Sequence, residues 1–181
     1  MRIDHPYSLM VRDRGLAWSC GQCPLDANGE VLAATDLMAQ TNAVAEFIEK
    51  IVSEMGMPIS SIGKLVAYHA EDNSAERTEM VSLLRKRIGD DVLVIPIKVP
   101  HFYYGGMLIE VDIHASIDRR GIQKVEDERF GLRLEILDGG PLLWVSLISH
   151  KEKERSTGDQ GLVQALGQLV KKAGLEEGSS R

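Results

Sequence analysis

Cysteine is scarce in this chain of 181 residues, which contains only Cys20 and Cys23. A structural zinc site takes four ligands, and the sequence has no second cysteine pair to complete one. The two residues form Cys-Gly-Gln-Cys, and a turn-forming segment from Pro24 to Gly29 follows them. A redox pair of the thioredoxin type instead opens a helix, whose N-terminus stabilises the thiolate. The pattern therefore argues against a zinc centre and against a dithiol redox site.

Basic residues and long apolar runs are also lacking. The 21 Lys and Arg residues are outnumbered by 27 Asp and Glu residues, which gives a net charge of -6. Nucleic-acid binding needs a concentrated basic surface, and the short basic clusters at 85–87 and 151–155 fit solvated surface better. No segment is long enough to cross a membrane, and residues 1–6 lack the apolar region of a signal peptide. We therefore expect a cytoplasmic protein that binds neither nucleic acid nor membranes.

The most informative segment present is 107–114, which alternates as a β-strand does. One face is apolar and carries Met107, Ile109, Val111 and Ile113. The other face carries Leu108, Glu110, Asp112 and His114. Two carboxylates and an imidazole at two-residue spacing can hold and move protons. Taken alone, the pattern favours an antiparallel strand with that face in water.

The order of the other predicted elements favours an α+β fold. The periodicity predicts strands at 8–11, 16–20, 62–70 and 92–99, a short extended piece at 31–32, and helices at 36–55 and 74–88. Pro96 cannot donate to a β-ladder, so the strand that contains it is expected at a sheet edge or interrupted there. Two long helices among hairpins are typical of one mixed sheet with both helices on one face.

The composition changes after residue 115, and the rest of the chain divides further. Polar and charged residues follow without periodicity, then strands at 132–137 and 142–148, then an apolar helical stripe that ends at Gly174. We expect four parts, namely a domain at 1–115, a linker at 116–129, a ββα extension at 130–175 and a disordered tail at 176–181.

The extension resembles the beginning of the chain. Its helical stripe matches that of the first helix at an offset of 118, so that Val44 corresponds to Leu162 and Gly56 to Gly174. Trp144 lies in its second strand, as Trp18 does in the first copy, and both are expected in a core. The match is either a partial internal repeat or a chance likeness of similar units.

Three short motifs lead to a family. They are Pro6-Tyr7-Ser8, then Gly21-Gln22-Cys23-Pro24 followed by Asn28-Gly29-Glu30-Val31, and Ile109-Glu110-Val111-Asp112. In their order and spacing they resemble the reactive-intermediate deaminase family, known as Rid or YjgF and as endoribonuclease L-PSP-like. The resemblance covers about the first 115 residues. It implies a chorismate-mutase-like fold, a homotrimer with ligand clefts between subunits, and hydrolysis of enamines or imines without a metal or cofactor.

The resemblance also assigns roles to individual residues. Glu110 matches the glutamate that positions or activates water. Tyr7, Cys20 and Gly21 would shape the cleft that binds the small-molecule substrate. Tyr103 would either line the rim of that cleft or anchor a hairpin.

One departure from the family concerns the substrate. Active members carry an arginine about 15 residues before the glutamate, and it binds the substrate carboxylate as a bidentate fork. Here that position is Ile95, and no arginine lies between Arg87 and Arg119. Lys98 is the nearby cation in sequence, and it either replaces the arginine or points to solvent. We therefore expect a deaminase whose substrate lacks a carboxylate anchor or, alternatively, a non-catalytic small-molecule sensor that uses the same cleft.

Overall fold

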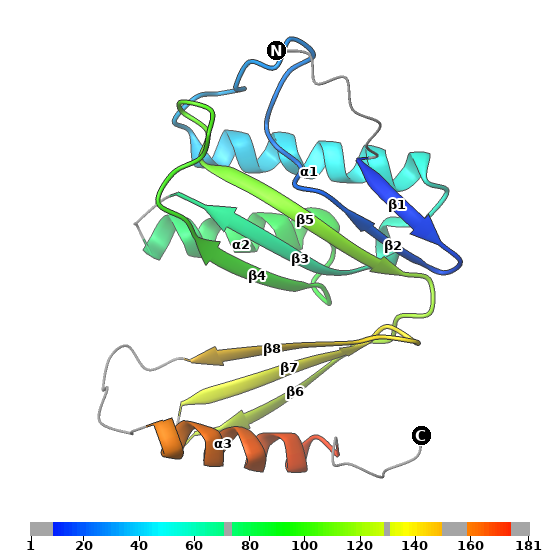
Figure 1. Ribbon diagram of the computed structural model, residues 1–181, viewed down its shortest axis with the longest axis vertical. Helices are drawn as coiled ribbons and strands as arrows, with labels where there is room; N and C mark the ends of the chain where they lie inside the picture. The colour runs from blue at the N-terminus through cyan, green and yellow to red at the C-terminus, as the bar shows by residue number, and fades with distance from the viewer. Residues whose placement is uncertain (1–8, 71–73, 129–130, 150–158, 175–181) are drawn as a thin grey trace. The chain divides into compact units, whose positions relative to one another are not determined.

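The computed structural model describes residues 9–70, 74–128, 131–149 and 159–174 (Figure 1). The chain divides into two compact units, Met1–Arg119 and Arg120–Arg181, and each is described by itself. No helix among the described residues is both long enough and apolar enough to cross a membrane.

The first unit is one mixed sheet with two helices on one of its faces (Figure 1). Its elements are β1 (Met10–Asp13), β2 (Leu16–Ser19), α1 (Leu37–Glu54), the 3-10 turn η1 (Ile59–Ser61), β3 (Ile62–His69), α2 (Ser74–Ile88), β4 (Leu93–Lys98) and β5 (Ile109–Ser116). The strand order is β1-β2-β5-β3-β4, and only β3 and β4 pair in parallel. The predicted α+β fold is confirmed, as is the edge position of the strand that contains Pro96. The expected piece at 31–32 contributes only an isolated bridge between Leu25 and Val31.

The sequence determines where α1 begins and ends. The Asp36 carboxylate accepts a hydrogen bond of 2.9 Å from the Ala39 N–H and so caps one free donor of the first turn. Gly56 follows the helix with a φ of 67°, a conformation that favours glycine. The apolar stripe of α1 packs on the sheet, where Val44, Ile48 and Val52 are fully buried.

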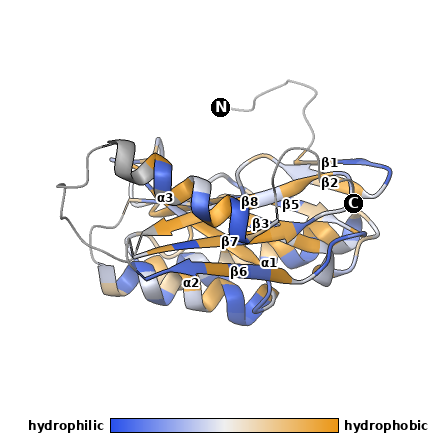
Figure 2. Ribbon diagram, turned by 90° about the horizontal axis from the view of Figure 1, so that it is seen from below, coloured by the Kyte–Doolittle hydropathy of each residue, from blue (hydrophilic) through white to orange (hydrophobic). Residues whose placement is uncertain are grey.

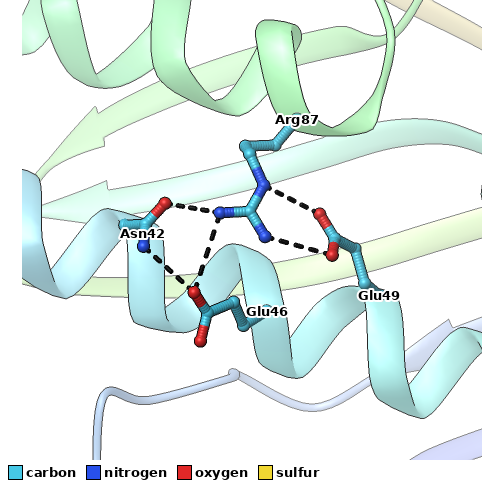
Figure 3. A network of polar contacts seen from close by, with 4 residues as sticks. All are labelled: Asn42, Glu46, Glu49 and Arg87. Carbon is cyan, nitrogen blue, oxygen red and sulfur yellow. Dashed lines mark hydrogen bonds and ion pairs between the residues drawn. The ribbon is translucent and has the colours of Figure 1, made fainter.

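Arg87 ties the two helices together on the side away from the sheet (Figure 3). It extends from α2 to α1, where its guanidinium donates to the two carboxylate oxygens of Glu49 at 2.9 and 3.0 Å. The same group donates to the side-chain oxygen of Asn42 and lies 3.8 Å from Glu46. This bidentate, partly buried pair fixes the spacing of the helices above the sheet.

The second unit is a three-stranded antiparallel sheet with one helix on one face. Its elements are β6 (Ile122–Asp127), β7 (Leu132–Asp138), β8 (Leu143–Ser149) and α3 (Asp159–Lys172), and β7 is the central strand. Leu169 of α3 and Ala173, which follows the helix, pack against Leu132, Leu134 and Ile136 of β7. Figure 2 colours most of this strand as hydrophobic. The expected 176–181 tail lies outside the described residues.

Two sequence expectations differ from the structure here. The segment expected as a linker contains β6, so the extension has three strands rather than two. Its sequence Ile-Gln-Lys-Val-Glu-Asp does not alternate, and pairing with β7 makes it a strand. Trp144 is buried as expected, but Trp18 is 44% exposed. The prediction for Trp18 was wrong because β2 turns Ala17 into the core and Trp18 to the other face.

Candidate functional site

The polar face of β5 lies on the side of the first sheet that the helices leave uncovered. Ile109, Val111 and Ile113 are fully buried in the core, so Glu110, Asp112 and His114 point away from it, as predicted. In the neighbouring strand β3, Tyr68 lies beside Glu110 and Lys64 lies beside His114. The Tyr68 hydroxyl donates to Oδ2 of Asp112 at 3.3 Å. The sheet therefore gathers five titratable groups on adjacent positions of two strands.

The backbone of the segment that follows β2 lies against the Glu110 side chain. Gln22 and Val111 exchange two backbone hydrogen bonds of 2.8 and 3.1 Å, which keep the segment beside β5. The Gln22 side chain is buried and donates to the Cys20 carbonyl at 2.8 Å. Gly21 therefore lies directly on the Glu110 side chain, and a Cβ at residue 21 would overlap its carboxyl group. Only glycine leaves room for Glu110 at this position.

Cys23 is the polar partner of Glu110. Its thiol lies beside the Glu110 carboxyl group and donates a long hydrogen bond of 3.9 Å to the Gly21 carbonyl. Burial, together with the negative charge of Glu110, raises the pKa of Cys23 to about 12, so the sulfur keeps its proton at neutral pH. Burial also raises the pKa of Glu110, the charge of Asp112 raises it further, and the nearby Cys23 thiol opposes both. A carboxyl group with a raised pKa can take up and return a proton in one reaction.

The neighbouring groups shift in the directions that their surroundings require. Burial lowers the pKa of His114, and the positive charge of Lys64 lowers it further, against the effect of Asp112. Burial raises the pKa of Tyr68, as do the charge of Asp112 and the hydrogen bond to it. Near neutral pH the imidazole and the phenol are therefore uncharged, and the negative charge of this face comes from the two carboxylates.

A cavity of about 700 Å³ lies between the segment at 20–27 and α1. Its wall includes Cys20, Gly21 and Cys23 from one side, Phe47 and Ile51 of α1 from another, and Tyr104. Glu110 is not among the described residues that line the cavity, but its carboxyl group contacts Gly21 and Cys23, which do. The site is thus a largely apolar hollow, and two residues of its wall contact the Glu110 carboxyl group.

One cation in this wall escaped the sequence analysis. Lys50 of α1 lines the cavity and lies 3.9 Å from Glu54, which lines it too. Asp26 adds a second carboxylate to the wall. The charges of the cavity therefore do not sum to an anion-binding site.

The other predicted site residues lie in different places. Cys20 and Gly21 line the cavity, whereas Tyr7 falls outside the described residues. Tyr103 is 93% exposed and contacts Tyr104 edge to face at 5.2 Å, and of the two only Tyr104 belongs to the wall.

Lys98 lies on the opposite face of the sheet from Glu110, because it pairs with the core-facing His69. The position that shares the row of Glu110 and Tyr68 is Ile97, and Ile95 shares the row of Asp112. Within one chain, therefore, β4 brings no cation to the face that carries Glu110.

Sequence reasoning missed Cys23, Gln22 and Tyr68 as members of the site. Tyr68 lies in the predicted strand at 62–70, so the face to which it points could be predicted from the alternation. The strand that would lie beside it could not be predicted. The described part of the chain contains no cluster of three His, Cys, Asp or Glu residues able to hold a metal ion.

Comparisons with known proteins concern the first unit. Residues 2–117 match the sequence profile of the family described as endoribonuclease L-PSP. Among solved structures, YyfB from Yersinia pestis, a protein of unknown function of the conserved Rid family, is similar with a TM-score of 0.54 and 22% identity, over 57% of this chain and 80% of that chain.

Two further structures agree with this likeness. The yjgF gene product of E. coli gives a TM-score of 0.54 and 20% identity, over 64% of this chain and 91% of that chain. TdcF of E. coli, solved with bound serine, gives a TM-score of 0.53 and 19% identity, over 62% of this chain and 88% of that chain. At these identities the likeness concerns the fold. No curated protein matches the chain.

Proposed function

The chain belongs to the endoribonuclease L-PSP family, whose structures include Rid and YjgF proteins, and on this premise we propose that it hydrolyses small enamines, imines or related carbonyl derivatives without a carboxylate anchor. One observation carries the proposal. The Glu110 carboxyl group has a raised pKa and contacts two residues of the cavity wall, Gly21 and Cys23.

The proposed reaction converts a protonated imine and water into a carbonyl compound and ammonia. The Glu110 carboxylate takes a proton from water while the water oxygen forms a bond to the imine carbon. The protonated carboxyl group then gives this proton to the amino nitrogen, and the C–N bond breaks as ammonia leaves. The remaining protonated carbonyl group loses its proton to solvent. Gly21 and Cys23 contact the carboxylate and would limit its movement during the reaction.

The composition of the cavity supports a substrate without a carboxylate. Its wall offers Phe47, Ile51 and Tyr104 to an apolar group, and its one lysine lies beside Glu54. Ile95 occupies the place of the family's arginine, and Ile97 lies in the row of Glu110. A site that lacks a bidentate donor binds a carboxylate poorly.

The test measures ammonia release from a panel of imines, half of which carry a carboxylate. Glu110→Gln keeps the size of the side chain and removes its acid–base function, so turnover should fall by about 10²–10⁴-fold. Glu30→Gln, which changes an exposed carboxylate, is the matched control and should leave turnover unchanged. Full activity in the Glu110 variant would refute the mechanism, and faster turnover of the carboxylate-bearing imines would refute the substrate class.

A second candidate function is a non-catalytic sensor that binds a small molecule in the same cavity. Ile95, in place of the family's arginine, is as consistent with a sensor as with an enzyme that has a changed substrate. Calorimetry on the same panel separates the two functions. Saturable binding without ammonia release by the unaltered chain would establish the sensor.

The proposal includes a homotrimer whose ligand clefts lie between subunits. Exposed apolar side chains on the uncovered face of the first sheet support a subunit interface there, namely Val11, Trp18 and Ile97. Residues of a neighbouring subunit would then cover Glu110 on this face.

A further inference from the structure

The edge strand β8 differs from the other edge strands of the described chain. Unpaired edges invite pairing with another chain, and proteins usually prevent this with charged residues, proline or short strands. The other three edges have such protection, in Arg12 and Asp13 of the short β1, Pro96 and Lys98 of β4, and Lys124 and Glu126 of β6. In contrast, β8 has seven residues without charge or proline, and it pairs with β7 along its whole length without a bulge.

On the face of the sheet that carries α3, the helix does not cover β8. Leu147 lies beside Leu134, and Val145 lies beside Ile136. Both β7 residues are buried under α3, so the β8 residues share their face. Nevertheless Leu143, Val145 and Leu147 are 43%, 46% and 40% exposed. The helix packs over β6 and β7 and leaves an apolar strip along β8.

The helix α3 has exposed apolar residues of its own. Val163 is 69% exposed and Leu166 is 37% exposed. Gly167, next to them, has no atom within 4 Å of the place where a Cβ would stand. Glycine inside a helix costs about 1 kcal/mol relative to alanine, and nothing in the described unit needs the space. A glycine here allows another helix to approach closely.

We propose that β8 pairs antiparallel with β8 of a second copy of this chain. A twofold axis through Val145 sets this residue opposite the same residue of the partner and sets Leu143 opposite Leu147. The result is a six-stranded sheet with α3 of each copy on the same face, side by side over the two β8 strands. Val163 and Leu166 then pack between the helices, and Gly167 lets them approach.

The charge pattern favours a second copy as the partner. Self-pairing of a strand brings each residue near its own kind, so a charged strand would repel itself. β8 carries no charge, and its exposed side chains are complementary to themselves because all are apolar. The first unit provides the internal comparison, since two helices there cover one sheet of five strands. Pairing through β8 would likewise place two helices on one face of a single continuous sheet.

The first test compares the mass of the full-length chain with that of two lysine variants by size-exclusion chromatography with light scattering. Val145→Lys puts a charge on the proposed axis at an already exposed position, so the assembly should fall to half the wild-type mass. Gln123→Lys puts the same charge on the other edge of the same sheet, at an exposed position, and should keep the wild-type mass. Equal masses for the wild type and Val145→Lys would overturn the proposal.

The second test does not depend on loss of assembly. In a background with Cys20→Ser and Cys23→Ser, Val145→Cys should form a disulfide between copies on mild oxidation. Opposed residues of antiparallel strands have Cα atoms about 4.5–5.5 Å apart, within disulfide range. Ser146→Cys is the matched control, because residue 146 lies opposite residue 144 and not opposite itself. Peptide mapping that finds a link at neither position, or at 146 alone, would overturn the pairing.

Discussion

The first unit covers its five-stranded sheet with two helices, whereas the second covers three strands with one helix. The first unit thereby buries its apolar face and keeps titratable groups on the other face of β5 and β3. The second unit leaves apolar side chains exposed beside its helix. The difference teaches that the two units divide the work, with acid–base chemistry in the first, on our proposal, and association in the second, on our further inference.

Two glycines express this contrast most directly. Gly21 in the first unit lies on the Glu110 carboxyl group with no room for a side chain, whereas Gly167 in the second faces open space. The same substitution should therefore have opposite effects on the folding stability of the two units.

The largest effect is expected for Gly21→Ala. The new methyl group would overlap the Glu110 carboxyl group, and either the segment at 20–23 or the Glu110 side chain must move. Forced overpacking of this kind costs about 1–3 kcal/mol of unfolding free energy. Urea denaturation measures the loss, and ammonia release should fall with it because Glu110 is displaced. Gly105→Ala is the matched control, since a Cβ there meets no atom within 4 Å and both readouts should stay at wild type.

Sequence periodicity predicted most of the fold of the first unit because its elements carry strong local signals. The alternation of 107–114 and the helix expected at 36–55 are local features, and both are confirmed. β6 was missed because its own residues do not alternate and its partner strand determines it. Trp18 was misplaced because burial of a large aromatic residue depends on the face its strand turns to the helices.

The candidate site was only partly predictable, for a related reason. Glu110 could be singled out from one strand and its motif. The close contact between Gly21 and the Glu110 carboxyl group is visible only in the structure. Cys23 belongs to the site because its segment folds beside β5. Lys50 belongs to it because α1 folds beside the loop at 20–27. No spacing within the sequence encodes those distances, so the thiol beside Glu110 could be found only in three dimensions.

The next effect is a gain in stability that sharpens the contrast. Gly167→Ala should raise the unfolding free energy of the second unit by about 1 kcal/mol, because alanine favours a helix and the methyl group meets nothing. The same methyl group would stand between the two α3 helices of the proposed pair. Sedimentation at a series of concentrations should therefore show weaker association despite the more stable fold. Tighter association would contradict the close helix approach, and in the Val145→Lys background the sedimentation should not change.

The smallest effect is a pH dependence confined to the first unit. The pKa of Glu110 is raised on folding, so its bound proton stabilises the fold fully below the unfolded pKa of about 4.3, and this contribution is lost as pH rises through the folded pKa. The amide of Glu110→Gln does not titrate, so the variant should gain stability relative to the wild type above about pH 4. The gain is small because solvent screens a partly buried carboxylate.

The two tryptophans allow this pH effect to be assigned to a unit. Trp18 reports on the first unit and Trp144 on the second, so a Trp144→Phe background isolates the unfolding signal of the first. Unfolding free energies of the wild type and Glu110→Gln, measured between pH 4 and pH 8, should then diverge as pH rises. Parallel curves would mean that the fold does not hold the Glu110 proton. A divergence together with lost turnover would separate the chemistry of Glu110 from any structural role, since the inactive variant would be the more stable one.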